Sequence, residues 1–162
     1  GAIGIQCIDI AESSGLVRGT LTGQSTERLS RLSSTLGGHP IDLGPATAMD
    51  GMAIFSYYMT CYDILMDDPG IDCVYFNIYI GTYMASEFYE DALKHMEANM
   101  KKPVAAWCYG PSRDAVRKLG DLMEAHHIPC YHTTSKAVTS LGRLVRYARW
   151  REKNRGSGSS PL

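Results

Sequence analysis

The first five residues, Gly1, Ala2, Ile3, Gly4 and Ile5, have the composition of a turn that brings main-chain N–H groups close to an anion. Small side chains leave room for a phosphate, and the helix expected from Ile5 to Gly15 would add the partial positive charge of its N-terminus. We therefore treat these five residues as a candidate phosphate-binding loop. An ordinary tight turn has the same local pattern, and spacing alone favours that simpler interpretation.

A second candidate loop follows the apolar run that ends at Phe76. Asn77 offers a side-chain amide, and Gly81 and Thr82 offer main-chain and hydroxyl donors, a combination that suits a substrate with a carboxylate. The candidate acyl-substrate residues are Asn77, Tyr79, Ile80, Gly81 and Thr82. The alternative is a β–α connection that only caps its own helix, and the local pattern favours it. A third loop, Gly110-Pro111-Ser112, is interpreted mainly as a helix cap.

The other reactive side chains show no catalytic or metal-binding pattern. None of the five histidines has a second ligand at metal-binding spacing. The sequence contains no Ser-His-Asp pattern, no nucleophile elbow and no complete P-loop. It therefore predicts neither a catalytic residue nor a metal site in this chain.

Composition narrows the class of protein. The 162 residues are 44% hydrophobic and 20% charged, a normal globular mix that is sufficient for one domain with a core. A net charge of −1 gives no electrostatic reason to expect nucleic acid or an anionic membrane, and no apolar run approaches a membrane span. The five widely spaced cysteines lack a C-x-x-C pair, so we predict free thiols in a reducing, cytoplasmic compartment.

Short apolar runs alternate with longer amphipathic stretches along the chain. The runs that predict strands are Ile41–Leu43, Cys73–Phe76, Val104–Cys108 and Ile128–Tyr131. Helical spacing occurs at residues 5–15, 26–36, 54–65, 89–100, 115–123 and 137–148, the last capped by Thr134 or Ser135. Nearly all-apolar strands are buried on both faces, and their alternation with helices implies right-handed crossovers. We predict an α/β fold, a flavodoxin-like doubly wound parallel sheet in three layers, with ligands at the carboxyl ends of its strands.

The organisation along the chain follows from this fold. A sheet of this type normally has a strand before the glycine turn, so we expect the first strand to be missing from this chain. Residues 1–150 are expected to form one domain. Residues 151–162 end in a Gly/Ser-rich run and are expected to form a flexible linker or tail.

Several segments together resemble a known family. They are Gly1 to Ile5 with Asp9, His39 to Leu43, Tyr62 to Asp72, Lys102-Pro103-Val104, Gly110, His127 to Tyr131, and Ala137-Val138. In this order and spacing, residues 1 to about 150 resemble the flavodoxin-like domain that follows the phosphohistidine-bearing domain of NDP-forming acyl-CoA (acetyl-CoA) synthetases. They are also similar to the C-terminal domain of the succinyl-CoA synthetase β subunit.

The resemblance implies a ligase that interconverts acid, CoA and NTP with acyl-CoA, NDP and phosphate. In that family, a histidine on a neighbouring domain takes phosphate from an acyl phosphate and carries it to a nucleotide in an ATP-grasp domain. Residues 1–5 would match the loop on the phosphate side, and residues 77–82 the loop on the acyl side. CoA, ATP or ADP and Mg would be needed by the complete enzyme and not bound by this domain alone.

The same resemblance implies partners. They would be the CoA-binding, phosphohistidine and ATP-grasp domains of the same protein or a partner subunit, together with a small carboxylic acid, in an oligomer. No position matches the phosphate-carrying histidine, so the isolated chain is expected to be inactive.

Some positions depart from the family pattern. Ala2 stands where the family usually has a second glycine, and His39 where it usually has asparagine. Tyr79 and Tyr83 are bulky where small residues or prolines are common. A non-catalytic regulatory module of the same fold, for example fused to an acetyltransferase, is an alternative that would tolerate these changes. A free-standing receiver-like or ligand-binding module is a third alternative, but the sequence has no acidic cluster for a receiver and no flavin loop of the usual length.

Overall fold

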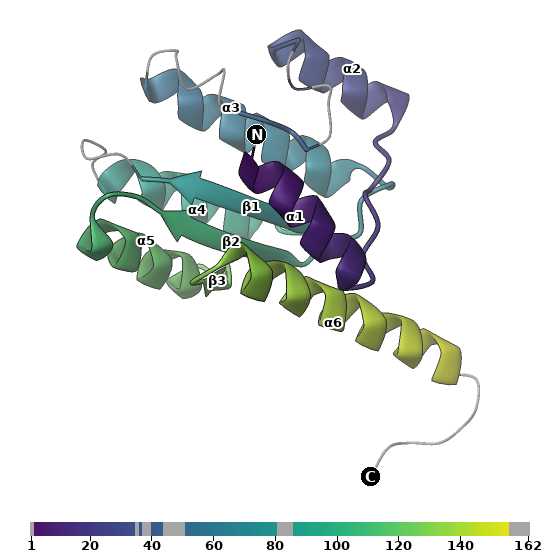
Figure 1. Cartoon of the computed structure of the whole chain (residues 1–162). Helices are drawn as coiled ribbons and strands as arrows, with labels where there is room; N and C mark the ends of the chain where they lie inside the picture. Colours follow the sequence, from purple (N-terminus) through teal and green to yellow (C-terminus); the bar gives the residue numbers. More distant parts are fainter. Residues whose placement is uncertain (1, 35, 37–39, 44–50, 81–85, 156–162) are drawn as a thin grey trace.

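The computed structural model describes residues 2–34, 36, 40–43, 51–80 and 86–155. Within this part of the chain, three strands and six helices alternate largely as the apolar runs and amphipathic stretches predict (Figure 1). In chain order the elements are α1 (Ala2–Ser13), α2 (Gly23–Leu32), α3 (Gly51–Asp67), β1 (Val74–Tyr79), α4 (Ser86–Ala98), β2 (Val104–Tyr109), α5 (Arg113–Ala125), β3 (Cys130–Tyr131) and α6 (Thr134–Asn154).

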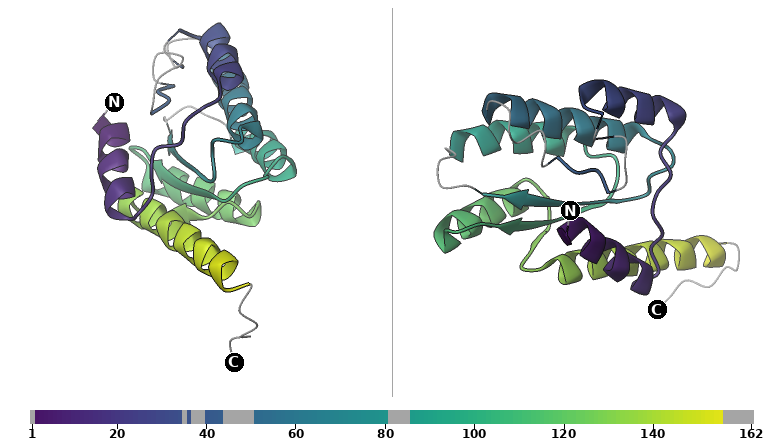
Figure 2. Two further views of the ribbon diagram at one scale, coloured as in Figure 1. Left: turned by 90° about the vertical axis from the view of Figure 1, so that its right-hand side faces the viewer. Right: turned by 45° about the horizontal axis from the view of Figure 1, so that its top comes forward.

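The three strands form a parallel sheet in the order β1-β2-β3. Val74 to Tyr79 pair in register with Val104 to Tyr109, and Trp107 pairs with Tyr131. Helices α1 and α6 cover one face of the sheet, whereas α3, α4 and α5 cover the other (Figure 2). The predicted α/β class, with a parallel sheet between helical layers, is therefore confirmed. The finer flavodoxin-like assignment stays a prediction, because the described residues contain three strands.

Side chains alternate between the two faces of the sheet, as the period of a strand requires. Val74 and Ile80 from β1 and its end join Ala106 and Cys108 in the larger core against α3, α4 and α5. Tyr75 and its neighbours face α1 and α6 in a smaller cluster. Among the described residues, the cluster on the α1/α6 face holds fewer buried apolar residues than the larger core.

β1 is an edge strand among the described residues. The Val74 amide donates to the Pro103 carbonyl, and the Ile80 amide donates to the Tyr109 carbonyl, so both amides point toward β2. Successive amides of a strand point in opposite directions. The main-chain groups of Tyr75, Asn77 and Tyr79 therefore point to the side of β1 where the described chain has no strand.

A buried carboxylate fastens α2 to the end of α3. Asp68 is 1% exposed, and its Oδ2 accepts hydrogen bonds from the Thr22 amide and hydroxyl, each at 2.9 Å. Its Oδ1 accepts the Gly70 amide at 2.7 Å. Burial alone would raise the pKa of Asp68, but hydrogen bonds from Ser25, Thr22 and Gly70 lower it to about 2. Thr22 is also the N-cap of α2, so this network fixes where that helix begins.

The strand expected at Ile41–Leu43 is wrong. These residues form no strand, and Ile41 and Leu43 pack instead against a cluster from α2 and α3. In a flavodoxin-like strand order, a strand here would pair with one that precedes α1. Among the residues that the structure describes, no strand pairs with this segment.

Two helices begin earlier than their patterns predict. α1 starts at Ala2, so residues 2–4 form the first helical turn and not a turn before the helix. α2 spans Gly23–Leu32, because the Thr22 side chain accepts the Ser25 amide and starts the helix ahead of residue 26. In both cases the sequence predicts the helix but misplaces its first turn.

The last helix also differs at both ends. Thr133, and not Thr134 or Ser135, caps α6 by accepting the Lys136 amide. The helix continues to Asn154, so residues 151–154 are helical where a flexible tail is expected. Residues 156–162 lie outside the described part of the chain. All five cysteines are free, as predicted. Among the helices that the structure describes, none combines the length and apolar character needed to cross a membrane.

Candidate functional site

The first turn of α1 and the end of β1 lie toward the same end of the sheet. α1 runs opposite to the strands, so its N-terminus points toward their carboxyl ends (Figure 1). Leu16, just after α1, packs in the same cluster as Cys73, just before β1. Cys7, farther up α1, lies close enough to Tyr75 to raise the pKa of its hydroxyl. Of the described members of the two predicted loops, residues 2–5 form the first turn of α1, and Asn77 and Tyr79 belong to β1 and not to a loop after it. Gly1, Gly81 and Thr82 lie outside the described residues.

Tyr75 connects the elements around this end of the sheet. Its hydroxyl shares a hydrogen bond with the Thr134 hydroxyl at the start of α6, with 2.8 Å between the oxygens. Burial raises the pKa of Tyr75 to about 12, although hydrogen bonds with Thr134 and Asn77 oppose the shift. The tyrosine is therefore a neutral hydrogen-bonding group that joins β1 to the start of α6.

The predicted acyl-substrate residues divide between the two faces. Asn77 and Tyr79 lie on the α1/α6 face, since they alternate with the core residues of β1. The Ile80 side chain is buried in the core on the opposite face, and its amide is bonded to Tyr109. Ile80 therefore supports the sheet and does not offer its side chain to a ligand beside Asn77.

Sequence reasoning missed an aromatic cluster, Tyr79, Trp107 and Tyr109, on the same face as Asn77. The rings of Trp107 and Tyr109 are stacked with centroids 4.7 Å apart, and the Tyr79 and Tyr109 centroids lie 5.4 Å apart. Asn77 is directly opposite Trp107 in the sheet register. Tyr79 is 56% exposed, so part of this cluster is open to solvent. The signal was the i, i+2 spacing of Asn77 with Tyr79 and of Trp107 with Tyr109.

The first turn of α1 packs against the segment that precedes Ile41. A Cβ atom on Gly4 would lie 2.5 Å from Cγ of Pro40, closer than real contacts allow. The close contact with Pro40 therefore explains why position 4 is a glycine, without any bound anion. The first turn contains no acidic residue, and the initial amides of any helix lack partners within that helix. Ala2–Ile5 thus form a helix start without an acidic side chain.

The loop after β2 reaches the end of β1. A Cβ on Gly110 would lie 2.4 Å from the Ile80 carbonyl oxygen, so glycine allows this close approach. Ser112 caps α5 by accepting the Ala115 amide at 3.3 Å, which confirms the predicted role of this loop as a cap. The loops after β1 and β2 are consequently held together at their bases.

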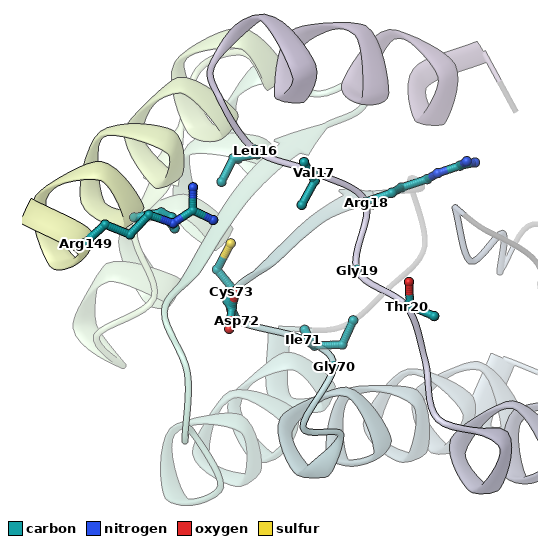
Figure 3. Close-up of a pocket in the computed structure, with 11 residues that line it drawn as sticks. Leu16, Val17, Arg18, Gly19, Thr20, Gly70, Ile71, Asp72, Cys73 and Arg149 are labelled. Carbon is teal, nitrogen blue, oxygen red and sulfur yellow. The ribbon is translucent and has the colours of Figure 1, made fainter. Parts of the chain in front are cut away.

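A separate cavity of about 280 Å³ lies at the other end of the sheet (Figure 3). It is lined by residues 16–20 after α1, residues 70–73 before β1, and Val145 and Arg149 of α6. None of the predicted site residues lines it. Within the described ranges no three His, Cys, Asp or Glu side chains gather as metal ligands, and we assign no step to a metal there.

A parallel sheet with helices on both faces defines an α/β domain. No family model matches the chain. The chain is 26% identical over 149 residues to acetate–CoA ligase [ADP-forming] II from Archaeoglobus fulgidus, which confirms the resemblance predicted from its motifs. That match covers 91% of this chain but only 21% of the relative's length.

Solved structures share the fold. PH0766 from Pyrococcus horikoshii OT3 matches 92% of this chain with a TM-score of 0.74 and 23% identity. Acetyl-coenzyme A synthetase 1 (dinucleotide forming) of Ca. Korarchaeum cryptofilum, in complex with phosphate and ADP, matches 99% with a TM-score of 0.71 and 19% identity. The chain spans 34% of each of these proteins. It is therefore similar to one domain-sized part of larger chains.

Proposed function

We propose that this chain is one domain of an NDP-forming acyl-CoA ligase, in which acid, CoA and NTP give acyl-CoA, NDP and phosphate. The sequence similarity to an ADP-forming acetate–CoA ligase carries this proposal, and the shared fold supports it. CoA, the nucleotide and Mg would be bound by other domains of a cytoplasmic enzyme. This domain would bind the phosphohistidine and the acyl group that those domains deliver.

The phosphate side of the proposed site is the start of α1. The amides of residues 2–5 lie in the first helical turn, where no acidic side chain competes with a phosphate. The partial positive charge of the helix N-terminus would stabilise the negative charge on a phosphorylated histidine. The contact between Gly4 and Pro40 would hold this turn in place.

The acyl side of the proposed site is the end of β1 and the loop after it. Asn77 would donate its side-chain amide to the carboxylate or acyl phosphate, and its bond with Tyr75 orients it. Tyr79 would border the acyl group, and Gly81 and Thr82 complete the loop in the sequence. Because the aromatic cluster adjoins Asn77, it would exclude water from the acyl carbon and favour charge stabilisation there.

An assay of the full-length protein tests the proposed reaction. Release of NDP is measured with NTP, CoA and a broad set of carboxylic acids, with each substrate omitted in turn. We expect release that requires both acid and CoA, together with an acid-labile phosphoryl group on a histidine. Absence of acid- and CoA-dependent NDP release with every acid would refute the ligase assignment.

Asn77→Ala in the active full-length enzyme is expected to raise the KM for the acid about tenfold, because one hydrogen bond to a charged group is lost. Asn77→Asp keeps the shape but places a negative charge against the substrate, so we expect a larger loss of kcat/KM. Steady-state kinetics with varied acid measures both. Arg117→Ala, on the exposed surface of α5, is the control and is expected to behave as wild type. Equal kinetics of wild type and Asn77→Asp would remove Asn77 from the site.

A non-catalytic module of the same fold is the second candidate. Ala2 replaces a glycine of the family pattern, and the packing of Gly4 against Pro40 explains the other glycine without a phosphate. An acetyltransferase domain in the full-length protein, with a small molecule that binds this domain and changes acetyltransferase activity, would favour this alternative. Acid-dependent NDP release would favour the ligase.

A further inference from the structure

The second half of α6 extends past the body of the domain. The buried residues of α6 end at Gly142, and the helix continues for another twelve residues to Asn154 (Figure 1). We call residues 143–155 the basic arm. Arg146 donates a hydrogen bond to the Ser14 carbonyl near the base of the arm, and Val145 and Arg149 border the cavity. The remaining surface of the arm is exposed.

Large apolar side chains form a stripe along the exposed arm. Leu144, Tyr147 and Trp150 are 45%, 55% and 51% exposed, and their spacing of three residues places them on one side of the helix. The rings of Tyr147 and Trp150 are stacked, with centroids 6.0 Å apart. Arg151 lies over the Tyr147 ring at 6.0 Å. Tyr, Trp and Arg are the side chains most enriched at the energetic centres of protein interfaces.

The arm is also the positive part of the chain. Residues 143–155 hold six Arg or Lys side chains and one carboxylate, Glu152, a balance of +5. The whole chain has a formal charge of −1, so the remainder carries −6. In the part of the chain that the structure describes, none of the six cations forms an ion pair with a carboxylate.

The acidic remainder of the chain favours one occupant. A polyanion such as nucleic acid or an anionic membrane would be attracted by the arm but repelled by the body of −6. A second copy of the chain offers the positively charged arm a negatively charged surface, because its residues outside the arm carry a net charge of −6. Its α1 has exposed Asp9 and Glu12 and no basic residue between Ala2 and Ser13.

We propose that two copies of this chain associate, with the basic arm of each copy docked on the acidic outer face of α1 of the other. α1 and α6 lie side by side in the same layer (Figure 2). A two-fold axis that places one arm on the partner's α1 therefore places the partner's arm on the first α1, which closes the assembly as an isologous dimer. Tyr147 and Trp150 form its apolar centre, and the arginines pair with Asp9 and Glu12.

Sedimentation equilibrium of residues 1–162 tests the dimer. We expect a dimer at low ionic strength and dissociation in about 1 M salt, where charges are screened beyond about 3 Å. The Tyr147→Ser/Trp150→Ser variant is expected to raise the dimer Kd at least about tenfold. Its circular dichroism and Tm are expected to match wild type, because both side chains lie outside the core.

Charge reversal provides the specific control. Arg151→Glu/Lys153→Glu is expected to weaken the dimer, and Asp9→Arg/Glu12→Arg in the same chain is expected to restore it. Arg117→Glu/Lys118→Glu changes the net charge equally on exposed α5 and is expected to leave association unchanged. A wild-type monomer at low salt, or a dimer that survives the Tyr147/Trp150 substitutions, would overturn the proposal. A monomer whose arm binds RNA or anionic vesicles would overturn it as well.

Discussion

Asp68→Asn is expected to lower the free energy of unfolding by about 3 kcal/mol. The carboxylate accepts the Thr22 amide and hydroxyl on Oδ2 and the Gly70 amide on Oδ1. An asparagine has one acceptor oxygen, so its NH₂ group must face one of these buried N–H donors. Unless a water molecule takes the place of the lost acceptor, that buried N–H group is left without a hydrogen bond, which destabilises the fold. Urea denaturation of the chain at neutral pH measures the loss.

The same substitution has a predictable pH dependence. The pKa of Asp68 falls from 3.8 to about 2 in the folded chain, because hydrogen bonds outweigh the effect of burial. A lowered folded pKa means that the carboxylate stabilises the fold above pH 4 and that this contribution is lost as the pH falls toward 2. The difference in stability between wild type and Asp68→Asn is therefore expected to shrink across that range. A difference that stays constant down to pH 2 would contradict the assignment.

The neighbouring Asp67 supplies a matched control. Its side chain is 48% exposed and pairs with Lys101, which is 60% exposed. Exposed pairs contribute little, so Asp67→Asn is expected to change stability much less than Asp68→Asn. Similar losses for the two substitutions would show that the buried network around Asp68 is not what fastens α2 to α3.

Gly142→Ala is expected to destabilise the chain by about 2 kcal/mol. A Cβ at this position would lie 2.6 Å from the Ser14 carbonyl oxygen and 2.9 Å from its Cβ. Ser14 is itself buried, and its amide is bonded to the carbonyls of Ile10 and Ala11, so it cannot retreat without moving the end of α1. The cost of separating α1 from α6 exceeds the gain of about 1 kcal/mol that alanine brings inside a helix. Thermal or urea unfolding measures the net change.

Gly120→Ala is the control, with the opposite expected sign. Gly120 is inside α5, and the nearest atom to an added Cβ is the Cys130 sulfur at 3.7 Å, an ordinary contact. Alanine there is expected to stabilise the chain by up to about 1 kcal/mol. If both substitutions stabilised the protein, the close contact between α1 and α6 would not exist in solution.

Periodicity predicted the sheet and its covering helices because burial on two faces leaves a clear apolar signature. The run at Cys73–Phe76 became β1, which continues three residues farther to Tyr79, and the run at Val104–Cys108 became β2, which continues one residue farther to Tyr109. Ile41–Leu43 is also bounded by turn residues, but no strand pairs with it among the described residues, and pairing depends on a distant segment that a local pattern does not contain. The start of α2 was misplaced for a similar reason, since its cap Thr22 is held by Asp68, 46 residues away.

Local sequence patterns predicted only those parts of the candidate site that do not depend on contacts between distant segments. Asn77 was singled out because it comes directly after an apolar run, but the strand β1 continues through it to Tyr79. The position of α1 follows from the alternation of strands and helices. The hydrogen bond of Tyr75 with Thr134 joins residues 59 positions apart, and the packing of Pro40 on Gly4 depends on the fold. The aromatic cluster was missed because Tyr109 lies beyond the predicted strand Val104–Cys108, and because the contact of Tyr79 with Tyr109 depends on the register of β1 against β2.

The position of β1 at the edge of the sheet has a consequence for isotope labelling. Amides of Val74, Phe76, Ile78 and Ile80 are directed toward β2 and are shielded, whereas those of Tyr75, Asn77 and Tyr79 face away from it. Hydrogen–deuterium exchange is therefore expected to be fast at the amides of Tyr75, Asn77 and Tyr79 and slow at the amides that alternate with them. Two of the fast amides belong to residues proposed to border the acyl group. Slow deuterium uptake at those amides in a larger assembly would report that another segment has bonded to this edge.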